Sequence, residues 1–385
     1  MNTQAWTIHN PSGSRRVVVT KELPGQRWLE ILIAADCRVE VSPSTDILGT
    51  DEIAAAIGTR CEGAIGQLTE AWKEVLFSTL AAAGGRAYSN YAVGFNNIDL
   101  DAATRHAIPV GNTPGVLTET TAEMAVALTF AAARRVVEAD RFLRQGRYKG
   151  WLPTLFIGEM LQGKTIGIIG AGRIGCAYAR MMVEGHKMNV IYYDIHPNPV
   201  LEDFVAAYGR FLESRGETPV ACRRARDVAE VLQTADAVSL HVVLDESTHH
   251  MINADSLALM KPQAILVNAS RGPVIDEAAL VDHCRKNPDF RVGLDVFENE
   301  PQLAPGLEEL PNAVIVPHIA SASTWSRQGM AILAASNVAA MLMGYPAWNR
   351  PDISAFLGDK PPKAAPSILN AEALGVPLYT NGGVE

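Results

Sequence analysis

Three polar residues that follow apolar runs in the second half of the sequence could together reduce a carbonyl group. Arg271 follows AILVNAS, Glu300 comes shortly after RVGLDVF, and His318 ends AVIVPH. Reduction of a 2-oxo acid needs a cation for the carboxylate, a donor that polarises the carbonyl, and an acid that protonates the developing alkoxide. Arg271 suits the first two tasks, His318 suits the third, and Glu300 would orient the imidazole. Each has an ordinary structural explanation when taken alone, so it is their shared place after apolar strands that predicts a catalytic set.

A glycine-rich turn gives the same region a cofactor site. Gly170, Gly172 and Gly175 follow the apolar run Thr165 to Ile169 and open an expected helix. This order is the dinucleotide fingerprint, because the glycines permit a tight turn, close approach of a pyrophosphate and close packing of helix on strand. A glycine turn without a ligand is the alternative. Asp194, about twenty residues further on, ends the next apolar run, where an acid accepts hydrogen bonds from ribose hydroxyls.

Asp194 also bears on the choice between the two nicotinamide cofactors. Its charge would repel a 2′-phosphate, and the residues Ile195 to Asn198 that follow include no arginine to neutralise one. Arg173, inside the turn, is expected to meet the pyrophosphate. The sequence therefore predicts NAD(H), with NADH preferred over NADPH.

Strand-like and helical runs alternate along the chain, which predicts an α/β fold with parallel sheets. One series starts at Arg15, and a second has six strand-like runs between Thr165 and His318. We expect two Rossmann-like domains, with an NAD-binding domain (118–318) inserted in a substrate domain (1–117 and 319–385) that ends in a Pro-rich tail. Residues 119–146 are expected to form one long Ala-rich hinge helix, and Leu201 to Arg215 an added helix.

Composition limits the classes of partner. A length of 385 residues, 48% hydrophobic and 19% charged, fits a globular enzyme of two domains. The net charge of −9, without any block of Lys or Arg, argues against nucleic acid, and the longest apolar run, 124–133, is too short to cross a membrane. No third ligand accompanies His249 and His250, so no metal site is expected.

Compartment follows from the cysteines and the end of the chain. Five scattered cysteines without a C-x-x-C pair favour a soluble protein of a reducing compartment, the cytosol or an organelle matrix such as a mitochondrion or peroxisome. The ending Gly383-Val384-Glu385 does not match the S-K-L-type peroxisomal targeting signal.

Longer motifs carry a family resemblance over most of the chain. Residues 270–277 (SRGPVIDE), 293–301 (GLDVFENEP) and 317–320 (PHIA) resemble the D-isomer-specific 2-hydroxyacid dehydrogenases. The resemblance implies that Arg271, Glu300 and His318 are the catalytic set. It implies that Asp295 contacts the nicotinamide carboxamide. It also implies cofactor contacts at Arg173, Ile174, Asp194, Ala269 and Thr121.

The resemblance also implies a substrate-carboxylate turn that offers the backbone N–H groups of Val93 and Gly94, alongside Arg271. Asn96 stands where many members have Asp, and Val243 stands where Pro is commoner. Trp325 and Arg327 are expected either to line the pocket or to lie in an interface.

The added helix, the segment Trp151 to Pro153 and the Pro-rich tail resemble the plant and algal hydroxypyruvate reductases of this family. That branch implies a homodimer of photorespiratory type, which reduces hydroxypyruvate to D-glycerate with NADH and also glyoxylate to glycolate. Three alternatives stay open: a reductase for another 2-oxo acid, such as a phosphoglycerate or glyoxylate enzyme, a formate dehydrogenase, and a non-enzymatic NAD-sensing binding protein.

Overall fold

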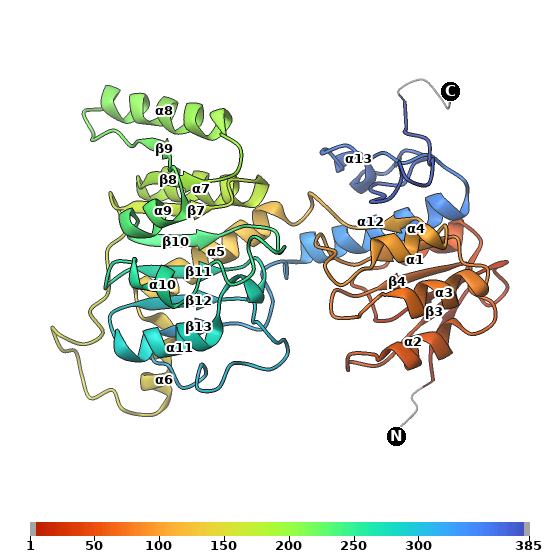
Figure 1. The fold of residues 1–385 in the computed structure, drawn as a ribbon, viewed down its shortest axis with the longest axis horizontal. Coiled ribbons are helices and arrows are strands. Elements are labelled where there is room, and N and C mark those ends of the chain that lie inside the picture. The colour runs from red at the N-terminus through yellow and green to blue at the C-terminus, as the bar shows by residue number, and fades with distance from the viewer. Residues whose placement is uncertain (1–4, 381–385) are drawn as a thin grey trace. The chain divides into compact units, whose positions relative to one another are not determined.

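A computed structural model describes residues 5–380, which divide into two compact units (Figure 1). The first unit comprises Met1–Leu117 and Ser323–Glu385, and the second comprises Thr118–Ala322. The chain thus leaves the first unit at Leu117 and re-enters it at Ser323, a few residues beyond the expected boundary at 318. The ending 383–385 lies outside the described residues, so the interpretation of that tripeptide stays an expectation.

The first unit is built on a six-stranded sheet in the order β1-β3-β2-β4-β5-β6. All described pairs are parallel except β1 with β3. Its core includes an aromatic cluster of Trp72, Phe77 and Tyr88, with the Trp72 and Tyr88 ring centroids 4.0 Å apart. The strands are β1 (Thr7–His9), β2 (Arg15–Val19), β3 (Cys37–Val41), β4 (Gly63–Gly66), β5 (Ala87–Asn90) and β6 (Val110–Gly111). The helices are α1 (Arg27–Ala34), α2 (Thr50–Ile57), α3 (Glu74–Ala82), α4 (Leu100–Arg105), α12 (Thr324–Leu342) and α13 (Ser354–Leu357).

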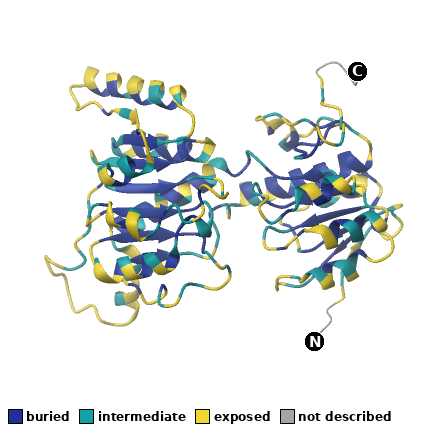
Figure 2. Cartoon of the chain, in the orientation of Figure 1, coloured by how far each residue is buried: buried dark blue, intermediate teal, exposed yellow. Residues whose placement is uncertain are grey.

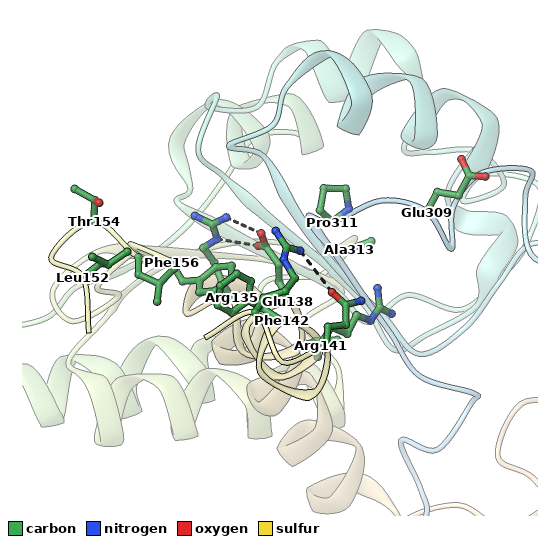
Figure 3. Close-up of a pocket in the computed structure, with 14 residues that line it drawn as sticks. Arg135, Glu138, Arg141, Phe142, Leu152, Thr154, Phe156, Glu309, Pro311 and Ala313 are labelled. Carbon is green, nitrogen blue, oxygen red and sulfur yellow. Dashed lines mark hydrogen bonds and ion pairs between the residues drawn. The ribbon is translucent and has the colours of Figure 1, made fainter. Parts of the chain in front are cut away.

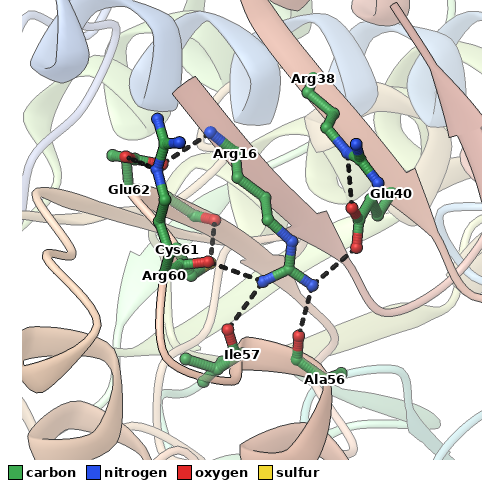
Figure 4. A network of polar contacts seen from close by, with 9 residues as sticks. Arg16, Arg38, Glu40, Ala56, Ile57, Arg60, Cys61 and Glu62 are labelled. Carbon is green, nitrogen blue, oxygen red and sulfur yellow. Dashed lines mark hydrogen bonds and ion pairs between the residues drawn. The ribbon is translucent and has the colours of Figure 1, made fainter. Parts of the chain in front are cut away.

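A half-buried arginine network stabilises the amino ends of these strands (Figure 4). The Arg16 guanidinium donates to the carbonyl oxygens of Ala56, Ile57 and Arg60 at 2.7–2.8 Å. It also pairs with Glu40 Oε2 at 2.6 Å. Its donors occupy carbonyls at and just beyond the end of α2, which have no partner within that helix. The network is therefore structural, and it leaves the carboxyl ends of the strands for chemistry.

The second unit is built on a seven-stranded parallel sheet in the order β13-β12-β11-β10-β7-β8-β9. The expectation of six strands is wrong by one, because Cys222–Arg224 adds the edge strand β9. That strand is short and polar, so it gave no apolar signal. The other strands are β7 (Thr165–Ile169), β8 (Asn189–Tyr193), β10 (Ala237–Leu240), β11 (Ile265–Asn268), β12 (Arg291–Leu294) and β13 (Ala313–Ile315). The α/β class with parallel-dominated sheets is confirmed.

Helices of the second unit follow the expected alternation with its strands. The added segment forms α8 (Pro199–Ser214), capped by Asn198, whose side chain accepts from the Leu201 N–H at 3.0 Å. Figure 2 shows the strands of both units as mostly buried and α8 as largely exposed. The other helices are α7 (Arg173–His186), α9 (Val228–Thr234), α10 (Ala254–Ala258), α11 (Glu277–Lys286) and the 3₁₀ turn η1 (Gly272–Val274).

The expected single helix over 119–146 is wrong. The segment forms two helices, α5 (Thr118–Ala133) and α6 (Val136–Arg144), separated by Arg134 and Arg135. Arg135 has a left-handed backbone (φ 56°), which an α-helix does not continue through, and its side chain pairs with Glu138 at 2.8 Å. The small alanines of α5 pack against α7 and the sheet, whereas α6 has no buried residue. A hinge role for this region stays a prediction.

Candidate active site

His318 and Glu300 form the closest contact among the residues predicted to be catalytic. The Nδ1 atom of His318 lies 2.9 Å from Glu300 Oε2, and Glu300 Oε1 accepts from the Phe297 N–H at 3.0 Å. Burial pushes the pKa of Glu300 up, but the hydrogen bond and attraction of His318, with help from Arg271, outweigh it and hold that pKa below its usual range. Glu300 is therefore a carboxylate at neutral pH. Because it occupies Nδ1, the imidazole presents Nε2 as the nitrogen that can exchange a proton with a substrate.

Asp295 positions the turn that carries His318. This residue follows β12 and is fully buried. Its two carboxylate oxygens accept from the N–H groups of Ile319 and Ala320 at 2.6 and 2.9 Å, and its carbonyl accepts from the His318 N–H at 2.8 Å. These bonds hold His318 in a left-handed conformation (φ 51°). The structure thus gives Asp295 a supporting contact, while its expected bond to the nicotinamide carboxamide stays a prediction.

Arg271 follows β11 and is held by its own turn. Asn268 donates from Nδ2 to the Arg271 carbonyl at 2.9 Å and accepts from Ser270 N at 3.0 Å. Burial lowers the pKa of Arg271, and the charge of Glu300 works in the opposite direction. An arginine remains protonated under such a shift, so the site contains a partly desolvated cation that interacts with the carboxylate beside His318.

Glu277, which sequence reasoning missed, holds the loop that carries Glu300. It begins α11 and is only 3% exposed. One carboxylate oxygen accepts from Glu298 N at 2.8 Å and the other accepts from Ala304 N at 3.3 Å. Burial raises the pKa of Glu277, although the hydrogen bonds from those two N–H groups act to lower it. The sequence could not separate this role from that of an ordinary acid in the first turn of a helix.

The glycine turn has the form that a dinucleotide site needs. Gly170 has φ +94°, and a Cβ on it would lie 2.7 Å from the His241 carbonyl carbon. A Cβ on Gly175 would collide with the Gly170 carbonyl oxygen, whereas Gly172 faces open space at the start of α7. Arg173 and Ile174 begin that helix, whose first N–H groups favour an anion.

Asp194 follows β8 with its carboxylate accepting from His196 N at 3.1 Å. The structure brings a cation to this turn that the local sequence did not reveal. Arg224, at the end of β9, donates to the carbonyl oxygens of Asp194 and Ile195 at 2.7 and 3.1 Å. The prediction considered only residues 195–198, which contain no arginine; Arg224 reaches this turn from β9, which was not recognised as a neighbour of β8. The Asp194 carboxylate remains the feature that would repel a 2′-phosphate.

The predicted carboxylate turn lies in the first unit, just after β5. Asn112 Nδ2 donates to the Val93 carbonyl at 2.8 Å, and Asn90 Nδ2 donates to the Gly94 carbonyl at 3.0 Å. The Val93 and Gly94 N–H groups make no hydrogen bond to another described residue. The bonds to the two carbonyls fix the backbone of the turn. Its adjacent, unused N–H groups can then bind an anion.

The other residues predicted from the sequence to line the site lie in several different elements. Thr121 is buried in the first turn of α5, and Ala269 is buried directly after β11. In the first unit, the Arg327 carbonyl accepts from the Tyr91 hydroxyl at 2.7 Å, and Trp325 is exposed. Among residues 5–380, no cluster of three or more His, Cys, Asp or Glu side chains could hold a metal ion.

A pocket in the second unit lies away from this chemistry (Figure 3). Its lining includes Arg135, Phe142 and Phe156, together with Pro311 and Ala313 at the amino end of β13. His318 follows the opposite, carboxyl end of the same strand. The pocket is therefore separate from the candidate site formed by Arg271, Glu300 and His318.

Replacing Glu300 with Gln should move the pH dependence of reduction. In the predicted reaction the protonated imidazole of His318 gives the proton, and the Glu300 carboxylate that attracts that proton would be absent in the variant. We expect the alkaline limb of kcat to shift to lower pH by roughly one unit. The matched control is Glu298→Gln, because Glu298 contacts His250 (2.7 Å) rather than His318. Superimposable profiles for wild type and Glu300→Gln would show that Glu300 does not couple to the transferred proton.

Comparisons with known proteins show the family of the chain. Residues 126–320 match the family model for the D-isomer specific 2-hydroxyacid dehydrogenase, NAD binding domain. The chain is 60% identical to glycerate dehydrogenase of Cucumis sativus, over 96% of this chain and 97% of that protein. It is 58% identical, over the same shares, to a peroxisomal glycerate dehydrogenase of Arabidopsis thaliana. A crystal structure of a Thermus thermophilus protein superimposes with a TM-score of 0.76 at 35% identity, covering 92% of this chain and 99% of that one.

Within the described residues, no helix has the length and apolar character to cross a membrane. The chain carries an NAD-binding domain over its second unit, and two relatives match it over almost its whole length. The chain belongs to the D-isomer specific 2-hydroxyacid dehydrogenase family of oxidoreductases.

Proposed function

We propose that this enzyme reduces hydroxypyruvate to D-glycerate with NADH, and reduces glyoxylate to glycolate less efficiently. The observation that carries the proposal is the pair formed by His318 and Glu300, with the Arg271 cation acting on the same carboxylate. An acid, a group that holds it, and a cation for a carboxylate are what a 2-oxo acid reductase requires. The names of the two plant relatives support D-glycerate as the product.

In the proposed reaction, Arg271 binds the substrate carboxylate and polarises the 2-oxo group. His318 donates the proton on Nε2 to the carbonyl oxygen as the alkoxide develops. Glu300 holds the ring through Nδ1 and stabilises its charge before the transfer. The Val93 and Gly94 N–H groups bind the substrate carboxylate from the first unit.

The chain's residues fit a bound nicotinamide dinucleotide. The open space at Gly172 admits the pyrophosphate, the first N–H groups of α7 bind its charge, and Asp194 accepts from the ribose hydroxyls. When bound, NADH supplies the hydride. Ile174, Thr121, Ala269 and Asp295 are proposed to complete the site.

A substrate panel tests the proposed function. NADH oxidation is followed with hydroxypyruvate, glyoxylate, pyruvate and 3-phosphohydroxypyruvate, and NAD reduction is followed with formate. We expect the highest kcat/KM with hydroxypyruvate. A higher value with the phosphorylated acid, activity with formate alone, or tight NADH binding without any turnover would each replace the proposal with one of the alternatives.

Cofactor preference should depend on Asp194. We propose that NADH is the better reductant, and that Asp194→Ala with Ile195→Arg shifts the preference toward NADPH by about 1–3 kcal/mol. Because Arg224 already lies at this turn, Asp194→Ala alone should produce part of the shift. The check is kcat/KM for both cofactors in wild type, both variants and the control Asp203→Ala on α8. Equal wild-type values for NADH and NADPH would remove the basis of this prediction.

We also propose that the enzyme is a homodimer in an organelle matrix. The segment after α6 exposes apolar side chains that a second copy could cover, with Trp151 80% and Met160 71% exposed. The Arabidopsis relative is named peroxisomal, which supports the compartment. Light scattering of the purified protein tests the dimer.

A further inference from the structure

Gln67 has a side-chain amide that finds no hydrogen-bond partner among the described residues. It is the first residue after β4 and is partly buried. Its backbone is engaged, since its N–H donates to Glu70 Oε2 at 3.0 Å and its carbonyl accepts from Asn97 Nδ2 at 3.1 Å. Its Nε2 atom is shielded from solvent and has no acceptor within reach. An amide left in this state destabilises a protein unless a ligand or a water satisfies it.

The structure fixes this amide close to the predicted carboxylate turn. Strands β4 and β5 are neighbours with Gly66 opposite Asn90, and the Tyr91 N–H donates to the Gly66 carbonyl at 2.9 Å. Asn97 joins the two loops that follow these strands. It donates to Gln67 and its Oδ1 atom accepts from Asn90 Nδ2 at 3.1 Å, while Asn90 also holds the Gly94 carbonyl. Gln67 and the Val93–Gly94 turn therefore lie in the loops that follow two adjacent strands, at the carboxyl end of the sheet and within a single unit.

Glu70, the acid of the same loop, does not satisfy the amide. Its Oε2 atom accepts from Gln67 N and from Trp72 Nε1 at 3.1 Å. Its Oε1 atom is also buried without a partner among the described residues, and burial raises the pKa of this carboxyl. A water between Glu70 and Gln67 is the structural alternative, which a test must separate from a role in binding substrate.

We propose that the Gln67 carboxamide binds the 3-hydroxyl group of the substrate and so selects hydroxypyruvate over 2-oxo acids that lack this group. The inference rests on the proposed function and names the residue that gives it specificity. Neighbouring strands lie about 4.8 Å apart, so a three-carbon acid held by its carboxylate at the β5 turn is long enough to reach the loop after β4. The terminal torsion of glutamine is soft, so either the amide oxygen or the amide nitrogen can face the hydroxyl. A site built to bind a hydroxyl discriminates strongly against analogues without one.

The test compares Gln67→Met with wild type on three substrates at saturating NADH. Methionine keeps the length of the side chain and removes its hydrogen-bonding groups. We expect kcat/KM for hydroxypyruvate to fall roughly 10- to 100-fold. The values for pyruvate, which has a methyl group in place of the hydroxymethyl group, and for glyoxylate, which has neither, should change less than about threefold. The matched control is Gln26→Met, an exposed glutamine just before α1.

The outcomes separate the inference from the proposed function. A wild-type enzyme that does not favour hydroxypyruvate over glyoxylate overturns the proposed function itself. A wild-type preference that survives unchanged in Gln67→Met overturns the inference alone and leaves the bridging water as the explanation. Equal losses with all three substrates also overturn it, because the residue then supports the turn without distinguishing the hydroxyl. Thermal unfolding midpoints identify any loss caused by a destabilised fold.

Discussion

Replacing His318 with alanine is expected to lower kcat for hydroxypyruvate reduction by roughly 10²–10⁴-fold while NADH affinity stays nearly unchanged. The substitution removes the proposed proton donor, but it leaves the glycine turn and Asp194 intact. Its Nδ1 contact with Glu300 is lost at the same time, so the carboxylate alone remains beside Arg271. Stopped-flow turnover and fluorescence titration of NADH measure the two quantities separately.

Two further variants make the His318 result interpretable. His318→Asn controls for the backbone conformation of residue 318, because asparagine tolerates the left-handed region better than alanine does. It should be as inactive as the alanine variant, since it carries no titratable proton. His106→Ala removes a histidine of the first unit that pairs with Glu74, and it should retain wild-type turnover. A loss of less than about tenfold in both His318 variants would mean that another group supplies the proton.

Replacing Arg271 with alanine should affect binding as well as turnover. The substrate carboxylate would lose a charged, forked partner, which costs about 2–5 kcal/mol, or roughly 30- to 4,000-fold in kcat/KM. Much of this loss should appear as a raised KM for hydroxypyruvate, unlike the loss in the His318 variants. Arg271→Lys keeps the charge without the planar fork and should recover only part of the activity.

Inhibition by oxamate provides an independent measurement for Arg271, because this inhibitor carries the carboxylate but is not reduced. Its inhibition constant should rise in Arg271→Ala and stay near the wild-type value in His318→Asn. An unchanged constant in Arg271→Ala would show that the N–H groups of Val93 and Gly94 hold the carboxylate without Arg271.

The residues of the candidate site could be found in the sequence because each follows an apolar strand that the sequence makes plain. Parallel strands bring their carboxyl ends to one edge, so Glu300 and His318 could be expected to meet from their order alone. Family resemblance supplied the carboxylate turn at Val93 and Gly94, which has no chemical signature in its side chains. The alternation of apolar runs predicted parallel sheets, and the added helical segment was expected over Leu201 to Arg215, where α8 is found.

Features that depend on contacts between distant segments were missed. Arg224 approaches Asp194 only because a short polar strand pairs with β8, and neither propensity nor periodicity marks that strand. The break at Arg135 was missed because both arginines are good helix formers, while the end of burial after Ala133 decides the outcome. Glu277 and Asp295 act on backbone N–H groups of loops, and sequence does not reveal which N–H groups a carboxylate will meet.

The left-handed backbone of His318 has a consequence for how this fold changes over evolutionary time. A side chain in that conformation is less stable than glycine by about 1 kcal/mol, so folding by itself favours Gly or Asn at this position. Under the proposed mechanism, selection for proton transfer maintains a histidine there against that bias. A descendant that kept the fold but abandoned catalysis, for instance to sense nicotinamide levels, should drift to Gly or Asn at this residue before its hydrophobic core changes. The identity of this one residue then indicates whether a distant homologue is still an enzyme.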